Sequence, residues 1–243
     1  MRVRSRLLTF LSATLMLTGL TFALTPTVAQ ADACRVGVIC GEVKNETNRT
    51  LYARYKDHDS DPWTVRSLAP GQKLGGCSSP TNCLDIDQVE IPAGCVARVS
   101  VGGNERYFPM GWDRWSSGAY VRVLELRCRD GRVYAWENIW NDETNGGLSC
   151  SWPEDDYNWG DNCGNFRNRA SAVQNNGSTT YNNAINLYYH TDHTGAWACL
   201  GPASVWRDMR WNYFSWGAGR DGYTYSINDQ VASSKWVRTC GTP

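Results

Sequence analysis

Residues 182–240 are NNAINLYYHTDHTGAWACLGPASVWRDMRWNYFSWGAGRDGYTYSINDQVASSKWVRTC, and this stretch decides the fold. Alternating residues at 184–189 predict a strand with one face on a core. A tight polar corner follows, in which Tyr188, His193 and Gly195 have the spacing aromatic-x4-aromatic-x-glycine, with a histidine at the second aromatic position. A corner folded under a ring needs a residue with positive φ, which glycine adopts without steric cost.

A polar motif near the end of this stretch has the composition of a calcium site. Residues 228–234, NDQVASS, are similar to the pattern Asn/Asp-Asn/Asp-x-x-Ser/Thr-Ser. Such a motif supplies oxygen ligands, of which calcium takes about six to eight. Aligned without a gap, Ala232 occupies the fifth position, where a hydroxyl is expected. Aligned with one inserted residue, Ser233 and Ser234 supply both hydroxyls, and both alignments stay open.

A diverged copy of the corner and of the polar motif precedes residue 182. Trp152, Tyr157 and Gly160 repeat the corner with one extra residue. Residues 167–172, RNRASA, repeat the polar motif, with Arg167 at an acidic position and an alanine in place of the last serine. Two such units predict a pair of Greek keys within one domain.

The two corners and two polar motifs, in this order, resemble the βγ-crystallin-like exported proteins of actinobacteria. These belong to a peptidase inhibitor family that includes the Streptomyces metalloproteinase inhibitor, and the resemblance covers residues 148–240. It implies a double Greek key in which each calcium site takes its acidic end from one key and its hydroxyl from the other. It also implies a rigid exposed loop that a protease binds like a substrate but releases slowly.

This resemblance implies at most one good calcium site. Its ligands are to come from Asn228, Asp229, Gln230, Ser171 and, in the gapped alignment, Ser233. The reciprocal site would place a guanidinium where the ion binds, and a guanidinium repels a cation. The alternative is that both motifs only cap hairpins, with Ser and Asn bonded to the local backbone.

Residues 1–31 have the features of a secretory signal peptide. Three arginines precede an apolar run at residues 7–24, and Ala-Gln-Ala at residues 29–31 is a small-x-small cleavage site. The alternative, a membrane anchor, is disfavoured because Thr and Ser interrupt the run and no stop-transfer pattern follows. We therefore expect an extracellular protein that has no membrane attachment after cleavage.

The charge of the mature chain disfavours nucleic acid as a partner. Cleavage would remove three of 24 basic residues and none of the 24 acidic ones, which leaves a net charge of −3. Binding a polyphosphate requires clustered Lys and Arg, whereas the basic residues here are scattered among acids.

All ten cysteines follow the expected cleavage site, and an even number in an exported chain predicts five disulfides. Six precede residue 130 and four follow it, which suggests two separately stapled domains. We expect the pairs Cys199–Cys240, Cys150–Cys163 and Cys77–Cys83, and the other pairs stay open. A catalytic free thiol is disfavoured because all ten cysteines are expected to form disulfides, and a zinc site is disfavoured because no CxxC pair is present. The cysteines are Cys34, Cys40, Cys77, Cys83, Cys95, Cys128, Cys150, Cys163, Cys199 and Cys240.

The composition predicts an all-β protein with two small disulfide-stapled domains. The polar run at residues 141–147 is the best linker, so we expect an N-terminal β-rich domain of unknown role at 32–145 and a βγ-crystallin-like domain at 146–243. Asp130-Gly131 predicts a two-residue hairpin turn. Turns are expected at residues 70–71, 92–94 and 102–104. Strands are expected in the first domain at residues 41–44, 50–55, 64–68, 88–91, 96–101 and 119–127.

Catalytic patterns are weak. There is no Gly-x-Ser-x-Gly elbow. His190 and His193 are either a surface cation site or, for His193, part of the corner. His58 lies in an acidic run that we expect at a solvated loop tip. The acids Glu154, Asp155 and Asp156 would suit a glycoside hydrolase, but we place them on the first corner.

The predicted function is therefore binding without catalysis. Inhibition of a secreted protease comes first, as the resemblance implies. The alternative is a calcium-stabilised structural or antimicrobial module that binds a cell-surface glycan, and the third is a glycoside-type hydrolase. We expect a monomer with no cofactor other than one calcium ion. Trp206, Trp211, Tyr213, Phe214 and Trp216 either form an exposed binding face or fill the core.

Overall fold

A computed structural model describes residues 40–243 except 58–59, 80–81, 116–117, 142–145 and 179–180. The expected signal peptide, Cys34 and His58 lie outside the described residues. Within the described part, seventeen strands and one 3-10 helix, η1 (Met209–Trp211), confirm the predicted all-β fold. No helix in these segments has the length and hydrophobicity needed to cross a membrane.

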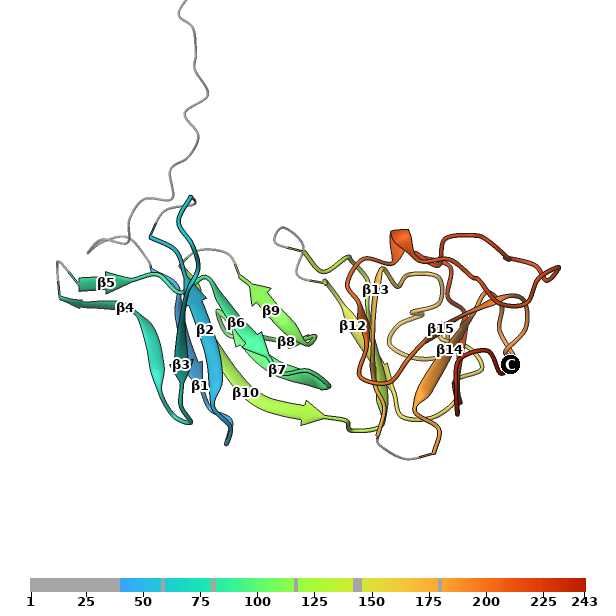
Figure 1. Ribbon diagram of the computed structural model, residues 1–243, viewed down its shortest axis with the longest axis horizontal. Helices are drawn as coiled ribbons and strands as arrows, with labels where there is room; N and C mark the ends of the chain where they lie inside the picture. The colour runs from blue at the N-terminus through green and yellow to red at the C-terminus, as the bar shows by residue number, and fades with distance from the viewer. Residues whose placement is uncertain (1–39, 58–59, 80–81, 116–117, 142–145, 179–180) are drawn as a thin grey trace, which may run out of the picture. The chain divides into compact units, whose positions relative to one another are not determined.

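Two sheets form the first half of the described chain (Figure 1). One has the order β5-β4-β1-β10-β7-β8, and β1 pairs in parallel with β10. The other has the order β3-β2-β6-β9. The strands are β1 (Glu42–Asn45), β2 (Leu51–Tyr55), β3 (Thr64–Leu68), β4 (Lys73–Ser79), β5 (Asn82–Leu84), β6 (Gln88–Ile91), β7 (Cys95–Val101), β8 (Asn104–Phe108), β9 (Gly111–Arg114) and β10 (Tyr120–Cys128).

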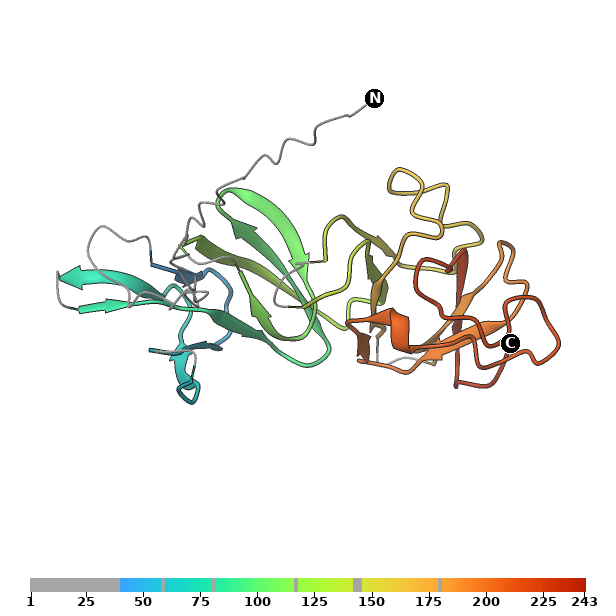
Figure 2. The same ribbon diagram turned by 90° about the horizontal axis from the view of Figure 1, so that it is seen from above.

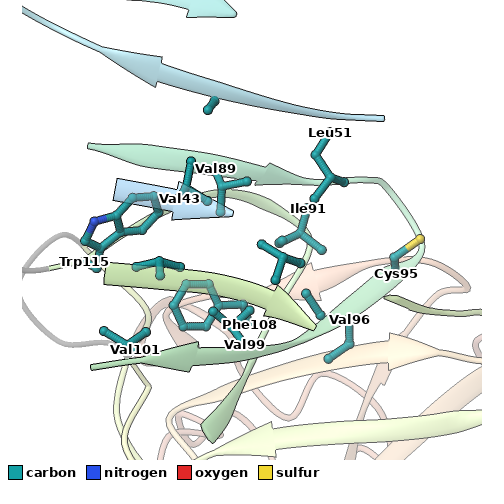
Figure 3. Packing of buried hydrophobic residues seen from close by; sticks show 14 of the residues in the cluster. Val43, Leu51, Val89, Ile91, Cys95, Val96, Val99, Val101, Phe108 and Trp115 are labelled. Atoms are coloured by element: carbon teal, nitrogen blue, oxygen red, sulfur yellow. The ribbon is translucent and has the colours of Figure 1, made fainter. Parts of the chain in front are cut away.

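Apolar side chains from both sheets form a core between them. Val89 and Ile91 of β6 lie close to Val99 of β7 and Phe108 of β8 (Figure 3). All four are fully buried or nearly so. This burial follows from the period-two spacing of a strand with one face on a core.

The six strands expected in this half are confirmed to within one residue at each end, but four others were not predicted. These are β4, β5, β8 and β9. The sequence of β4, KLGGCSS, has two glycines and little apolar alternation, and β8 is largely exposed. The β4 and β5 pair runs side by side (Figure 2) and is joined by Cys77–Cys83.

Two further sheets form the second half. One has the order β12-β11-β13-β16 and the other the order β15-β14-β17. Between them lies a second core that includes Trp159, Phe166, Ile185 and Phe214. The strands are β11 (Arg132–Trp136), β12 (Ser149–Trp152), β13 (Ala172–Asn176), β14 (Ala184–Tyr188), β15 (Trp197–Leu200), β16 (Val205–Trp206) and β17 (Ser233–Val237).

The predicted hairpin at Asp130-Gly131 is wrong. β10 pairs with β1 and β7, whereas β11 pairs with β12 and β13. The carboxylate of Asp130 accepts hydrogen bonds from the Tyr134 hydroxyl at 2.6 Å and the Asn176 amide at 2.8 Å. These bonds hold the turn to β13, so the chain passes into another sheet. β11 thus joins the strands that follow residue 146, while the boundary at 145 stays a prediction.

The structure contains the three disulfides that the sequence suggested and one that it left open. Cys77–Cys83, Cys150–Cys163 and Cys199–Cys240 are confirmed, and Cys95–Cys128 joins β7 to β10. Cys40 is also oxidised. None of the cysteines in the described segments is free.

A buried ion pair joins β9 to the segment that precedes η1. Asp113 is fully buried, and its Oδ1 accepts hydrogen bonds from Arg207 Nη1 at 2.7 Å and from the indole nitrogen of Trp140. Its Oδ2 is shielded from solvent and has no partner among the described residues. Burial raises the pKa of Asp113 from 3.8 to about 7, against the lowering effects of Arg207 and Trp140.

Candidate functional site

The strands of the second half repeat with an approximate two-fold relation. Trp136 of β11 pairs with Ala172 of β13, as Tyr188 of β14 pairs with Ser233 of β17. The outer edge of each sheet is formed by a segment of the other unit. β16 pairs with β13, and Asp156, which follows β12, forms a bridge to Ser234 of β17. Each unit therefore contributes one chain segment to the sheet of the other.

The two polar motifs occupy equivalent places in this repeat. The backbone N–H of Asp229 donates to the carbonyl of Ala170, and the N–H of Asn168 donates to the carbonyl of Val231, both at 2.9 Å. Asp229 and Asn168 also share a left-handed backbone, with φ of 56° and 57°. Residues 132–237 form a double Greek key. This arrangement confirms the βγ-crystallin-like fold that the sequence predicted.

Solved βγ-crystallin structures are similar to the chain. One, described as "Evolution of the eye lens beta-gamma-crystallin domain fold", has 16% identity and a TM-score of 0.32 and covers 45% of this chain and 87% of its own. The βγ-crystallin of Ciona intestinalis has 14% identity and a TM-score of 0.31, with 44% and 100% covered. Neither a protein-family model nor a curated protein matches the chain.

The corner of the second key has the predicted arrangement. The His193 ring fills the second aromatic position, because it lies 5.4 Å from the Tyr188 ring and 4.4 Å from that of Tyr157. Gly195 has a φ of 77°, and a Cβ there would lie 3.1 Å from the ring of His190. The positive φ therefore favours glycine, and a side chain at this position would also crowd the His190 ring.

The corner of the first key is marked, among the described residues, by backbone hydrogen bonds from Glu137 to Leu148 and from Asn138 to Gly146, so its prediction from Trp152, Tyr157 and Gly160 is wrong. The N–H of Glu137 donates to the carbonyl of Leu148, as that of Tyr189 donates to Ala196 in the second key. Trp152 instead stacks in the core on the Trp159 ring at 4.2 Å, and Tyr157 covers the other key's corner. The missed signal is Trp136 followed by Gly146 and Gly147, at a longer spacing than in the second key.

Across the two keys, the structure brings Ser171 and Asp229 together. The Ser171 hydroxyl donates to Asp229 Oδ1 at 3.1 Å, and the Asn228 side-chain amide donates to Asp229 Oδ2 at 2.6 Å. The amide oxygen of Asn228 is shielded and has no hydrogen-bond partner in the described segments. A shielded oxygen without a hydrogen-bond partner costs free energy unless something binds it. The Asn228 amide oxygen is therefore available to coordinate a cation.

A second carboxylate, which the sequence did not reveal, acts on the same cluster. Partial burial raises the pKa of Asp229, and the charge of Glu137 raises it further, against the hydrogen bonds from Ser171 and Asn228. Glu137 accepts a hydrogen bond from the Arg169 guanidinium. Glu137 is thus already paired with a cation, whereas the Asp229 carboxylate, the Asn228 amide oxygen and the Ser171 hydroxyl are oxygen donors of the kind that a hard cation prefers. These three residues fit calcium.

The equivalent position in the other half of the repeat lacks this donor set. Asp229 corresponds to Asn168, and the residue before it is Arg167 in place of an asparagine. Ser171 corresponds to Ala232, and Glu137 to Tyr189. The position around Asp229 and Ser171 is therefore rich in oxygen donors. The equivalent position around Asn168 and Ala232 has neither the carboxylate nor the serine hydroxyl.

The other two predicted ligands have separate roles in the structure. The Ser233 hydroxyl donates to the carbonyl of His190 at 2.7 Å and accepts from the N–H of His193 at 3.2 Å. The N–H of Gln230 donates to Ile227 within a turn. The equivalence of Ala232 with Ser171 corresponds to the ungapped alignment, and Ser233 caps the corner.

The histidines and the acidic loop have other partners. His190 Nε2 lies 2.7 Å from Asp221 Oδ2, and His193 Nε2 lies 2.9 Å from the carbonyl of Ser234, so the two rings do not share a ligand. Within the described segments, the one group of three close His, Cys, Asp or Glu ligands is Cys40, Cys77 and Cys83, and these cysteines are oxidised. The acids at 154–156 follow β12, outside the corner on which we expected them.

The aromatic residues of the second half divide between core and surface. Phe214 is fully buried, Trp206 is half-buried, and Trp211, Tyr213 and Trp216 are 74%, 50% and 41% exposed. Phe214 therefore fills the core, whereas Trp211, Tyr213 and Trp216 are exposed and available for binding.

Proposed function

We propose that the protein is exported, acts by binding, and holds one calcium ion between its two Greek keys. The contact between Ser171 of one key and Asp229 of the other carries this proposal. A calcium ion there would supply a positive charge shared by both keys. The four disulfides suit an oxidising, extracellular environment.

Each residue of the site has a defined part. Asp229 would provide the negative charge, while Glu137 keeps its ion pair with Arg169. Asn228 would offer its shielded amide oxygen, and Ser171 its hydroxyl. The raised pKa of Asp229 means that protons compete with the ion, so calcium affinity should fall as the pH falls.

Calorimetric titration with calcium tests this proposal. The wild type should bind one ion per chain, and Asp229→Asn, which keeps the shape but removes the charge, should abolish binding. Asn168→Ala changes the equivalent residue of the repeat and serves as the matched control, which should bind as the wild type does. Equal binding by Asp229→Asn and the wild type would overturn the site.

Inhibition of a secreted protease is our second proposal, and an exposed aromatic segment that begins at the last residue of η1 supports it. Trp211, Tyr213 and Tyr225 are each at least half exposed. Backbone hydrogen bonds between Phe214 and Tyr225 at 3.0 Å, and between Thr224 and Phe214 at 2.9 Å, order the segment. A pre-ordered loop loses less entropy on binding a protease.

Stoichiometric titration of thermolysin-like and subtilisin-like proteases tests this second function. We expect loss of protease activity at one equivalent, which Trp211→Ala should weaken. Tyr52→Ala removes an aromatic side chain of β2 that is 48% exposed and serves as the control. Cleavage of the protein without inhibition would count against this role.

A further inference from the structure

We propose that a groove made of two adjoining hollows at residues 153–155 binds an oligosaccharide that contains protonated amino sugars. This inference rests on the proposed binding function and gives that function a ligand. One hollow of about 590 Å³ is lined by Glu154, Asp155, Tyr157, Asn182 and Trp236, among others. This volume lies within the range of about 300–1,000 Å³ that is typical of ligand sites.

A second hollow makes the groove long enough for an oligomer. It has a volume of about 330 Å³ and shares Pro153, Glu154 and Asp155 with the first. Asn162 also lines it. Because the same three residues border both hollows, these adjoin each other at one segment. An extended ligand could therefore contact both.

The segment that borders the groove is fixed before any ligand binds. Cys150–Cys163 closes the loop that contains it. Asp155 Oδ1 accepts a hydrogen bond from the backbone N–H of Trp236 at 2.7 Å, and Asp156 N–H donates to the carbonyl of Ser234 at 2.8 Å. Both bonds join the loop to β17, so little conformational entropy is lost on binding.

The lining has the chemistry of an amino-sugar site. The ring of Tyr157, which is 60% exposed, and that of Trp236 offer apolar surface to the C–H face of a sugar ring. Trp236 lies so close to Gly177 that a Cβ on that glycine would be 2.8 Å from the indole. The amide of Asn182 can bond sugar hydroxyls.

The charge of the groove selects a cationic sugar. Within the described residues the exposed carboxylate of Glu154 forms no hydrogen bond or ion pair, so it is available to an ammonium group. Arg132 also lines the second hollow, where its one positive charge is outnumbered by the carboxylates of Glu154, Asp155 and Asp156. Its guanidinium is held by hydrogen bonds to the Ser151 hydroxyl at 3.1 Å and to the Ser151 carbonyl at 3.3 Å. Acidic polysaccharides would be repelled by Glu154 and Asp155.

Calorimetry on the whole chain with three probes tests the inference: a glucosamine tetramer, its N-acetylated form and tetralysine. We expect the glucosamine tetramer to bind, and Glu154→Gln to weaken this by about tenfold or more, since a charge-assisted hydrogen bond is lost. Glu105→Gln removes an acid from β8 and should change nothing. The N-acetylated tetramer should bind at least about tenfold more weakly.

Several results would overturn the inference. These are no binding of the glucosamine tetramer, equal binding of the acetylated form, an unchanged Glu154→Gln variant, or tighter binding of tetralysine, which would indicate a protein ligand. Calcium titration of the same samples separates the two proposals. Loss of sugar binding with calcium binding intact would refute only the groove, and the reverse would refute only the calcium site.

Discussion

Replacing Arg207 with methionine should destabilise the protein, and the cost should depend on pH. The substitution removes the cation that lies 2.7 Å from the fully buried carboxylate of Asp113. Removing one partner of a buried ion pair costs about 3–5 kcal/mol, because the remaining charge is uncompensated. This full cost applies where Asp113 is ionised.

The direction of the pH dependence follows from the raised pKa of Asp113. In the unfolded chain the carboxyl ionises near 3.8, and in the folded chain near 7. The stability that this group contributes is fully present below the unfolded pKa and is lost as the pH rises to about 7, by up to about 1.4 kcal/mol per pH unit. Without Arg207, the pKa of Asp113 should rise further and the loss should extend to higher pH.

Urea denaturation of the wild type and Arg207→Met at pH 5 and pH 8 measures this cost. At pH 8, one unit above the pKa of Asp113 in the wild type, we expect a loss of about 2.5–3.5 kcal/mol in the free energy of unfolding, because linkage adds at most about 1.4 kcal/mol per pH unit to the cost at pH 5. At pH 5, where Asp113 is protonated, the loss should be about 1–2 kcal/mol, the value of the hydrogen bonds alone. In an Asp113→Asn background the pH dependence should disappear. An equal cost at both pH values would refute the reasoning.

Three further predictions follow from the second half of the chain. Gly146→Ala should destabilise by about 3 kcal/mol or more in urea denaturation, since the new Cβ would overlap the Trp140 indole ring at a residue with a positive φ. The control Gly219→Ala also has a positive φ but has open space around it, so it should cost only about 1–2 kcal/mol. Equal costs for the two variants would contradict the packing of Gly146. Cys199→Ser combined with Cys240→Ser should lower the free energy of unfolding by about 2–5 kcal/mol, and an unchanged denaturation midpoint would contradict a stabilising role. Ser171→Ala should weaken calcium binding about tenfold in calorimetry, as expected for loss of one neutral ligand, and unaltered affinity would exclude its hydroxyl from the site.

The parts of the fold that the sequence predicted correctly depend on short motifs, each of which lies within one segment of the chain. The second corner is an example, because its aromatic positions and Gly195 fall within one short segment with fixed spacing. The pairing of Ser171 with Asp229 was also predicted, through the repeat of the polar motif and the resemblance it supports. Both rely on local patterns that physical constraints make recognisable.

Features that depend on tertiary packing were not predicted. The first corner was missed because the glycines follow Trp136 at a longer spacing, and with it Glu137, which the structure places near Asp229. The Asp113–Arg207 pair joins residues 94 positions apart, and no local pattern reveals it. At Asp130-Gly131 the predicted hairpin turn was wrong, because hydrogen bonds from Tyr134 and Asn176 to Asp130 direct the chain into another sheet.

Thermal unfolding with and without calcium tests most directly whether an ion stabilises the two keys together. At a free calcium concentration about 100 times the dissociation constant, binding should add about 2.7 kcal/mol. For a folded unit of about 150–250 residues, the unfolding midpoint of the wild type should then rise by about 5–10 °C. The midpoint of Asp229→Asn should not change. An unchanged wild-type midpoint, or the same rise in Asp229→Asn, would contradict a calcium ion held between Ser171 and Asp229.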